Sequence, residues 1–475
     1  MTSPRYDARF GAGQLRRRIC AAMGHAGLGL LGGGGPARAR AEPPTYAKAD
    51  APKARTQPLM DALEAIVNDA QRPLASLAVL AIRNGSVVFE AALGHRDIAA
   101  GLPATPDTLY RIASISKLVT AIGFMQLVES GQVELDRDVA AYLGGPLRNP
   151  AFPDQAITAG MLLNHTSSLR DAGDLFPAQV GQRIEQALKP GASGMRWATA
   201  AGQGPENRYF NYANVNYVLL GTLIERVSGQ RFDRYMQQRV FQPLRLRASF
   251  NPVQDFEPTE LQQLATLYRK SPDQGRTWDA SGPWIPQGPD RTGVRASGIP
   301  RLEQYAVGDN AGVFGPQGSL RISVRGLGTL MRLMLNEGTV DGVQILRPTT
   351  VRTMLEPHWV FNGHSRTPNG NTYRGLFYAW GLGPQRFTDH GGKPGSGDRI
   401  GSAAGGFSGA GHLGDAYGLL SGLVFDPVSR NGMAYAIGGV SSDPERYRGA
   451  YSAFSRWEEA VLAALQAHIL APKTR

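Results

Sequence analysis

The chain has 475 residues, 42% of them apolar and 19% charged, which is the composition of an ordinary globular protein with one large domain or two. Its formal net charge is +11, but residues 1–41 carry more than half of the surplus, with seven arginines and one aspartate. The remaining weak surplus, with no basic cluster interleaved with aromatic residues, argues against a nucleic-acid partner.

Residues 14–41 have the pattern of an export signal. Arg16–Arg18 form a charged start, Ile19–Leu31 a short and weakly apolar centre, and Ala39–Ala41 an A-x-A cleavage site. We therefore expect a periplasmic or secreted protein whose mature form begins near Glu42. Sec and twin-arginine export both stay open, and a low-complexity leader without this role is the alternative. No run reaches the ~18 apolar residues that span a bilayer.

Cysteine and histidine usage narrows the chemistry. Cys20, the single cysteine, lies in the expected leader, so the mature protein would have neither disulfides nor thiolate catalysis. The eight histidines are scattered, without the spacing of metal ligands. We expect no metal and no cofactor.

The first part of the body predicts a helix and a hairpin. Leu59–Ala70 has helical periodicity. Leu77–Ile82 and Val87–Ala92 are short apolar runs, and Asn84-Gly85 between them is a strong hairpin signal.

The next segment, Tyr110–Gly131, holds a serine and a lysine three residues apart. Ser114 and Lys117 open an apolar, helix-periodic run, so they share one face of a helix. Burial lowers the pKa of a lysine amine, and an adjacent base makes a serine hydroxyl a usable nucleophile. Ser-x-x-Lys is a loose pattern that usually lies on solvated helix surface. Here it occurs once, however, in a chain in which only seven of 50 basic residues are lysines.

The middle of the chain is mostly helix and loop by pattern. Before the apolar helical run Tyr217–Val227, Tyr212 and Asn214 stand two residues apart, a spacing that lets both project into a cleft. A phenolate near a cationic lysine would be a competent base. The structural alternative is a core tyrosine with a capping asparagine, and Tyr209-Phe210-Asn211 has the same spacing.

The last part of the chain turns to strands, Tyr417–Phe425 and Met433–Ile437, and closes with a helix over Arg446–Leu470. Gly411-His412-Leu413-Gly414-Asp415 precedes the first strand, and glycine beside a strand lets a ligand approach the backbone. His412 is therefore a candidate to hold substrate or steer a proton. A lone histidine is more often structural, and the loop that starts at His390 competes for the role.

These elements predict an α+β fold with an antiparallel sheet flanked by helices. We place a linker at 42–54 and the domain at 55–471. The sheet would come from about 55–115 and 316–471, with the N-terminal hairpin and the C-terminal strands in one sheet. Residues 116–315 would form a mostly helical inserted subdomain.

Taken in order, Ser114-x-x-Lys117, Tyr212-Ala213-Asn214 and His412-Leu413-Gly414 resemble the three motifs of the serine beta-lactamase-related family. That family holds class C beta-lactamases, D-alanyl-D-alanine carboxypeptidases, D-aminopeptidases and family VIII esterases. Leu163–Leu169 also resembles its L-x-H-T-S-G-L stretch, and Tyr212–Gly221 its Y-S-N-x-x-Y-x-L-L-G stretch. The second likeness selects Tyr212 over Tyr209. The resemblance implies a beta-lactamase/transpeptidase-like fold.

The resemblance also implies an acyl-enzyme mechanism on a small ester, amide or peptide. Ser114 would attack a carbonyl, and Lys117 and Tyr212 would share activation and proton transfer, with the identity of the base left open. Asn214 would hold substrate or Lys117. The N–H groups of Ser114 and Asp415 would form the oxyanion hole.

The third motif departs from the family, because beta-lactamases and carboxypeptidases typically have Lys-Thr-Gly there and use it to bind a substrate carboxylate. His412 and Leu413 replace the lysine and threonine, and only Gly414 is kept. Leucine donates no hydrogen bond, and histidine is mostly neutral at pH 7. We therefore expect an exported serine hydrolase of esterase or aminopeptidase type. The alternatives are a class C-like beta-lactamase or carboxypeptidase, and a non-catalytic ligand-binding member of the fold.

Overall fold

The computed structural model describes residues 53–171, 179–189, 195–288, 298–363, 365 and 367–470. The expected export signal lies outside them, so it stays a prediction, as do the domain boundaries. Within the described ranges, no helix combines the length and the apolar character that crossing a membrane requires.

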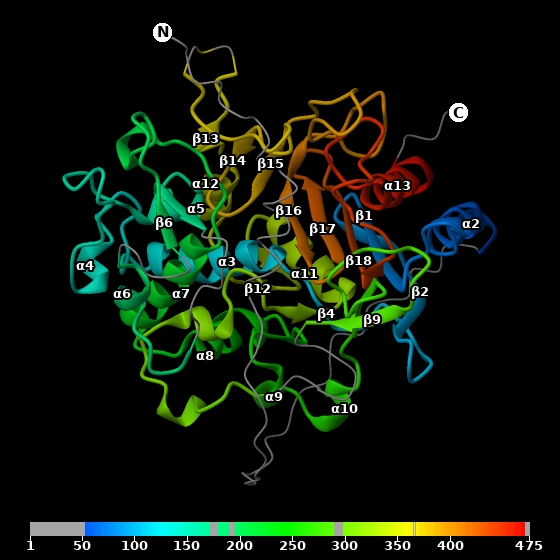
Figure 1. Ribbon diagram of the computed structural model, residues 1–475, viewed down its shortest axis with the longest axis horizontal. Coiled ribbons are helices and arrows are strands. Elements are labelled where there is room, and N and C mark those ends of the chain that lie inside the picture. The colour runs from blue at the N-terminus through cyan, green and yellow to red at the C-terminus, as the bar shows by residue number, and fades with distance from the viewer. Residues whose placement is uncertain are drawn as a thin grey trace.

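One nine-stranded sheet forms the centre of the fold, and every neighbouring pair in it is antiparallel (Figure 1). The strand order is β13-β14-β15-β16-β17-β18-β1-β2-β3. The bounds are β1 (Ser76–Arg83), β2 (Ser86–Asp97), β3 (Leu102–Pro103), β13 (Trp359–Val360), β14 (Ala379–Trp380), β15 (Gln385–Phe387), β16 (Gly409–Ala416), β17 (Leu419–Asp426) and β18 (Asn431–Ile437). The N-terminal hairpin thus pairs with the C-terminal strands, as predicted.

The hairpin turn forms at Asn84 and Gly85, whose φ angles are 49° and 78°. Two consecutive left-handed residues are what a two-residue hairpin with the normal strand twist requires, which explains the Asn-Gly signal.

Helices cover both faces of the sheet. On one face lie α2 (Lys53–Val67) and α13 (Arg456–Leu465), and on the other lies α11 (Val324–Leu335) (Figure 1). Because side chains alternate along a strand, Leu77 and Val79 of β1 pack in one core cluster and Leu80 in the other. Burial on both sides explains why β1 is continuously apolar.

The helical part of the molecule is built around α3 (Ile115–Glu129), which is buried from Ile115 to Leu127. It contacts α7 (Val215–Ser228) on one side and β16 on the other, so its N-terminal end lies where the helical part meets the sheet. The other α-helices among the described residues are α4 (Ala140–Leu143), α5 (Ala159–Leu163), α6 (Ile184–Ala187), α8 (Phe232–Met236), α9 (Pro252–Asp255), α10 (Pro258–Leu261) and α12 (Pro348–Leu355).

Short strands pair outside the main sheet. Their bounds are β4 (Tyr110–Arg111), β5 (Leu169–Asp171), β6 (Met195–Trp197), β7 (Ala248–Ser249), β8 (Leu267–Lys270), β9 (Trp284–Gln287), β10 (Arg321–Ile322), β11 (Thr339–Val340), β12 (Val343–Gln344) and β19 (Gly439–Val440). β4, at the edge of the β4–β10–β7 group, comes just before α3 in the chain.

Two predicted elements have wrong boundaries. The closing helix begins at Arg456 rather than Arg446, because Ser455 and Glu458 form a capping box that starts the helix there. The apolar strand begins at Leu419 rather than Tyr417. Tyr417 and Gly418, with φ of 57° and 86°, form a turn, and the His412 motif lies on β16 before it.

Candidate active site

Ser114 stands at the N-terminal end of α3 and is 6% exposed. The preceding residue, Ala113, has a φ of 48°, a left-handed conformation that costs a residue with a side chain about 1–2 kcal/mol. Such strain is common beside functional groups and here makes the sharp turn from β4 into the helix.

Lys117 lies one turn further along α3 and is completely buried. Its Nζ has three polar neighbours: Ser114 Oγ at 3.0 Å, Asn214 Oδ1 at 2.7 Å and the Gln317 backbone carbonyl at 2.8 Å. The structure therefore brings the predicted serine, lysine and asparagine together around one amine.

Burial lowers the pKa of Lys117 to about 7, although the negative charge of Asp171 opposes this shift. Desolvation disfavours the charged amine, as the apolar surroundings of the motif predicted. Near pH 7, the neutral and the charged forms of the Lys117 amine are therefore populated to similar extents.

Asp171 is a site residue that sequence reasoning missed. Its Oδ2 accepts from the backbone N–H of Asn214 at 2.8 Å and from the Asn214 Nδ2 at 2.9 Å, and its Oδ1 accepts from Val215 N–H at 3.1 Å. Because Nδ2 of Asn214 is bonded to the carboxylate, Oδ1 must face Lys117. A single acidic residue 43 positions before Asn214 has no local pattern that would reveal this contact.

Tyr212 lies beside the pair: it lines the same pocket as Ser114, its side chain interacts with that of Ser114, and its ring is 4.9 Å from the Lys117 nitrogen. Burial raises the pKa of Tyr212 above its ordinary value of 10, so the phenol keeps its proton near pH 7. The phenolate base considered from sequence is not favoured here. Tyr209 is only partly buried and packs instead against the Arg170 guanidinium, 5.7 Å from its ring.

His165 is a second missed residue, in the stretch that was noted only for its resemblance. It is fully buried, and its Nδ1 accepts from Ala213 N–H at 3.2 Å. Its ring lies 4.4 Å from the Tyr212 ring, so it supports the turn that carries Tyr212. Burial, and then the charge of Lys117, lowers the pKa of His165, so it stays neutral.

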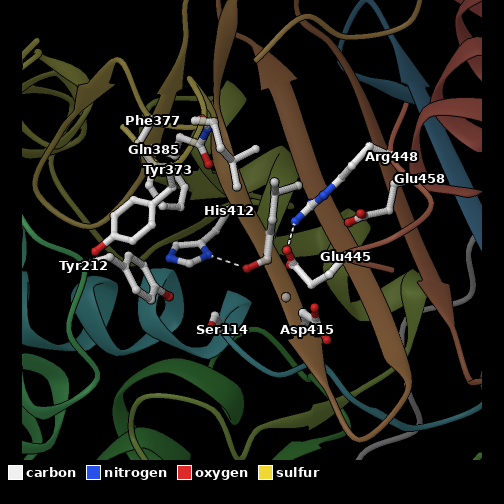
Figure 2. Close-up of a pocket in the computed structure, with 13 residues that line it drawn as sticks. Ser114, Tyr212, Tyr373, Phe377, Gln385, His412, Asp415, Glu445, Arg448 and Glu458 are labelled. Carbon is white, nitrogen blue, oxygen red and sulfur yellow. Dashed lines mark hydrogen bonds and ion pairs between the residues drawn. The ribbon is translucent and has the colours of Figure 1, made fainter. Parts of the chain in front are cut away.

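The third motif runs along β16, next to Ser114 (Figure 2). Gly414 approaches so closely that a Cβ there would lie 2.4 Å from the Ile112 carbonyl oxygen and 3.2 Å from Ser114 N. Glycine is thus required by space. The close approach places the Gly414 backbone beside Ser114 N–H, and the oxyanion role of the Ser114 and Asp415 N–H groups stays a prediction.

His412 is 2% exposed, and its Nδ1 lies 2.7 Å from the Leu413 carbonyl oxygen. Burial lowers the pKa of His412 to about 3, with the Lys117 charge as a smaller cause. Its ring makes an edge contact with Trp380, at 5.4 Å between centroids, and lies 6.2 Å from Tyr212. His412 is therefore neutral throughout the physiological pH range.

One pocket is lined by Ser114 of the first motif, Tyr212 of the second and the residues of the third, whereas Lys117 and Asn214 lie behind its lining. Its lining residues are Ser114, Tyr212, Tyr373, Leu376, Phe377, Gln385, His412, Leu413, Gly414, Asp415, Glu445, Arg448 and Glu458 (Figure 2). Among these described residues Arg448 is the one cationic side chain, and it forms an ion pair with Glu445. In the described part of the chain, no group of three or more His, Cys, Asp or Glu side chains is placed to hold a metal.

Comparison with known proteins shows the family and the fold. The family model described as Beta-lactamase matches residues 53–455. Penicillin-binding protein 4 of Amycolatopsis lactamdurans is 30% identical over 217 residues, 44% of this chain and 54% of that protein. Penicillin-binding protein 4* of Bacillus subtilis is 31% identical over 173 residues, 35% of each chain. The chain thus spans about half or less of the length of these relatives.

Solved structures show the same fold. The octameric penicillin-binding protein homologue from Pyrococcus abyssi has a TM-score of 0.58 at 19% identity, covering 87% of this chain and 77% of that one. The D-amino acid amidase from Ochrobactrum anthropi SV3 in complex with D-phenylalanine has a TM-score of 0.57 at 18% identity, covering 86% and 98%. With its beta-lactamase/transpeptidase-like fold and a family model that matches most of its length, the chain belongs to the Beta-lactamase family of serine hydrolases.

Proposed function

We propose that this protein hydrolyses an ester or amide substrate that carries no carboxylate for the pocket to bind. The reaction passes through an acyl-enzyme on Ser114, with Lys117 as the base. The observation that carries the proposal is the set of contacts around the Lys117 nitrogen. Asn214 Oδ1 and the Gln317 carbonyl are both acceptors and take two N–H bonds. A neutral amine has only two N–H bonds, so its lone pair is left for the third neighbour, the Ser114 hydroxyl.

The proton path follows from these positions. Ser114 Oγ bonds to the substrate carbonyl carbon while its proton passes to Lys117. The bond from that carbon to the leaving oxygen or nitrogen then breaks, and the leaving atom takes up a proton through the Tyr212 hydroxyl, whose side chain lies beside Ser114 in the pocket lining. Water then attacks the acyl-enzyme ester on Ser114. The proton transfers run in reverse, and the acid is released. The N–H groups of Ser114 and Asp415 stabilise the oxyanion in both steps.

The chemistry of the pocket supports a substrate without a carboxylate. Leu413, Leu376 and Phe377 give the pocket apolar walls, and His412 is neutral. Arg448 is already paired with Glu445. A carboxylate of the kind that beta-lactams and cell-wall peptides carry would therefore meet no unpaired cation among the lining residues that are described.

The named relatives are compatible with either of two substrate classes. The amidase on the same fold favours an enzyme of esterase or aminopeptidase type. The penicillin-binding proteins favour the alternative, a beta-lactamase or carboxypeptidase. The neutral His412 and apolar Leu413 support the first class.

A labelling experiment with a substrate screen tests the proposal. A fluorophosphonate probe should add to Ser114, as measured by intact mass and peptide mapping, and Ser114→Ala should abolish the label. Ser130→Ala, at the exposed C-terminal end of the same helix, is the matched control. The screen compares p-nitrophenyl butyrate, nitrocefin and D-alanine amide. A protein that takes no label and turns over none of them would be a binding member of the fold instead.

We also propose export of the chain, on the strength of Arg16–Arg18 and Ala39–Ala41. Mass spectrometry of native protein should find a mature N-terminus near Glu42 outside the cytoplasm. Full-length protein in the cytoplasm would contradict this.

A further inference from the structure

A buried acceptor atom in the pocket has no use in the mechanism above. His412 is buried, with 2% of its surface exposed, and its Nε2 has no hydrogen-bond partner among the described residues. A buried polar atom without a partner costs stability, and such atoms are rare in folded proteins. It therefore calls for an explanation.

The chemical role of that atom is fixed by the other ring nitrogen. Nδ1 faces the Leu413 carbonyl oxygen at 2.7 Å, and a carbonyl only accepts, so Nδ1 must carry the hydrogen and donate. The neutral ring then has a lone pair on Nε2. Figure 2 shows that the ring edge away from Leu413 faces Tyr212.

A second lining residue has the same property. Gln385 is 1% exposed, and its Nε2 donates to the Leu376 carbonyl at 2.6 Å, which fixes the orientation of the amide. Its Oε1 is left without a partner in the described part of the structure. Two separate side chains of the lining, each oriented by a backbone carbonyl, thus present an acceptor without a partner; the Tyr373 hydroxyl, which can donate or accept, also has no partner among the described residues.

We propose that Nε2 of His412 accepts a hydrogen bond from the N–H of the leaving nitrogen, which makes His412 the residue that selects secondary or primary amides over esters. The inference rests on the proposed acyl-enzyme chemistry at Ser114. Tyr212, which supplies the proton to the leaving atom, packs beside His412, whereas the oxyanion donors lie along Gly414 and Asp415. The leaving atom is therefore on the His412 side.

The nature of the leaving atom decides the sign of this contact. When the amide nitrogen becomes tetrahedral, its lone pair takes the proton from Tyr212. The N–H bond that this nitrogen already carries then points toward His412. An ester oxygen has a lone pair in that place and would face the lone pair of Nε2. The nitrogen of a beta-lactam ring carries no hydrogen, so it gains nothing from this contact either. A site built to accept a hydrogen bond discriminates strongly against a substrate that cannot donate one.

The test compares leaving groups on one acyl group. The probes are butyryl p-nitroanilide, its N-methyl derivative, which has no N–H, and p-nitrophenyl butyrate. The variants are His412→Phe, which removes the acceptor, and His412→Asn, whose amide can donate to Leu413 and still accept. His95→Phe, at an exposed histidine on β2, is the matched control. Fluorophosphonate labelling of Ser114 and thermal unfolding establish that each variant is folded.

We expect His412→Phe to lower kcat/KM for the anilide by about 10-fold or more and to change the ester by less than about 3-fold. His412→Asn should recover part of the loss, and the N-methyl anilide should be poor for the wild type and insensitive to the variants. Equal losses for ester and anilide would overturn the inference, because His412 would then act only through Tyr212. So would a wild-type enzyme that hydrolyses the ester but not the anilide.

The wild-type comparison of the two anilides needs no variant, so the inference stays testable even if both His412 variants unfold. If the N-methyl anilide reacts as fast as its N–H parent, relative to their rates with hydroxide, the contact does not exist. Failure of every substrate and of the Ser114 label would instead overturn the proposed function.

Discussion

The polar groups around the Lys117 nitrogen and those of His412 and Gln385 differ in how far their hydrogen bonds are satisfied. On the helical side, the Lys117 nitrogen has three polar neighbours, and the Asn214 amide is bonded at both its oxygen and its nitrogen. On the sheet side, Nε2 of His412 and Oε1 of Gln385 have no partner among the described residues.

The difference separates two tasks. A satisfied network keeps the base and the nucleophile in one geometry before any substrate arrives, which reduces the reorganisation needed during reaction. Unsatisfied acceptors cost stability until a ligand with matching donors fills them. We therefore expect the residues around Lys117 to determine the reaction, and His412 and Gln385 to determine the substrate. The following changes test that division.

The largest effect is expected for the nucleophile and its base. Ser114→Ala and Lys117→Ala should each lower kcat by about 10³-fold or more, with little further loss in the double variant, because the pair acts as a unit. Steady-state kinetics on the best substrate measures this. Losses that add up in the double variant would show that the two residues act independently.

Tyr212→Phe should lower kcat by about 10²–10³-fold, within the range of general acid–base catalysis, because the hydroxyl beside Ser114 is lost. Tyr209→Phe is the control and should stay within about 3-fold of the wild type, since Tyr209 lies outside the pocket lining. The reverse pattern would mean that the second motif is centred on Tyr209.

On the sheet side, His412→Lys together with Leu413→Thr should raise kcat/KM for nitrocefin relative to p-nitrophenyl butyrate. A charge-assisted hydrogen bond to the substrate carboxylate contributes roughly 1.5–3 kcal/mol, or about 10- to 150-fold. The ratio of the two constants, measured on the same preparation, is the readout. A wild-type enzyme that already prefers nitrocefin would contradict the proposed substrate class.

Local patterns predicted the residues that lie close together along the chain. Ser114 and Lys117 meet because one helical turn separates them, and Asn84-Gly85 makes the hairpin because both residues accept a left-handed backbone. The apolar run of β1 predicted a buried strand. In each case the physical cause acts within a few residues, so the sequence carries the signal.

The contacts missed from sequence are made across long separations. Asp171 reaches Asn214 over 43 residues, and Lys117 reaches the Gln317 carbonyl over 200, neither with any periodic pattern. Strands β13, β14 and β15 have only two or three residues each and are too short for alternation to show. The role of His412 depends on which of its nitrogens faces Leu413, which only the folded strand defines.

A change at Asp171 is expected to have the smallest and most specific effect, because Asp171 contacts neither Ser114 nor the pocket. Its negative charge raises the pKa of Lys117 against the effect of burial. Asp171→Asn removes that charge, so the pKa of Lys117 should fall below about 7. Activity requires the neutral amine, and therefore the acid limb of the kcat/KM profile should move to lower pH.

The plateau of the same profile reports on geometry. Without the carboxylate, the Asn214 amide loses the acceptor that turns its Oδ1 toward Lys117, and a loss of about 1.4 kcal/mol would lower the plateau about 10-fold. Asp154→Asn, at an exposed loop position, is the control and should leave both features unchanged. An acid limb that stays in place or moves to higher pH would show that Lys117 is not the group whose deprotonation activates Ser114, and the assignment of the base would then pass to Tyr212.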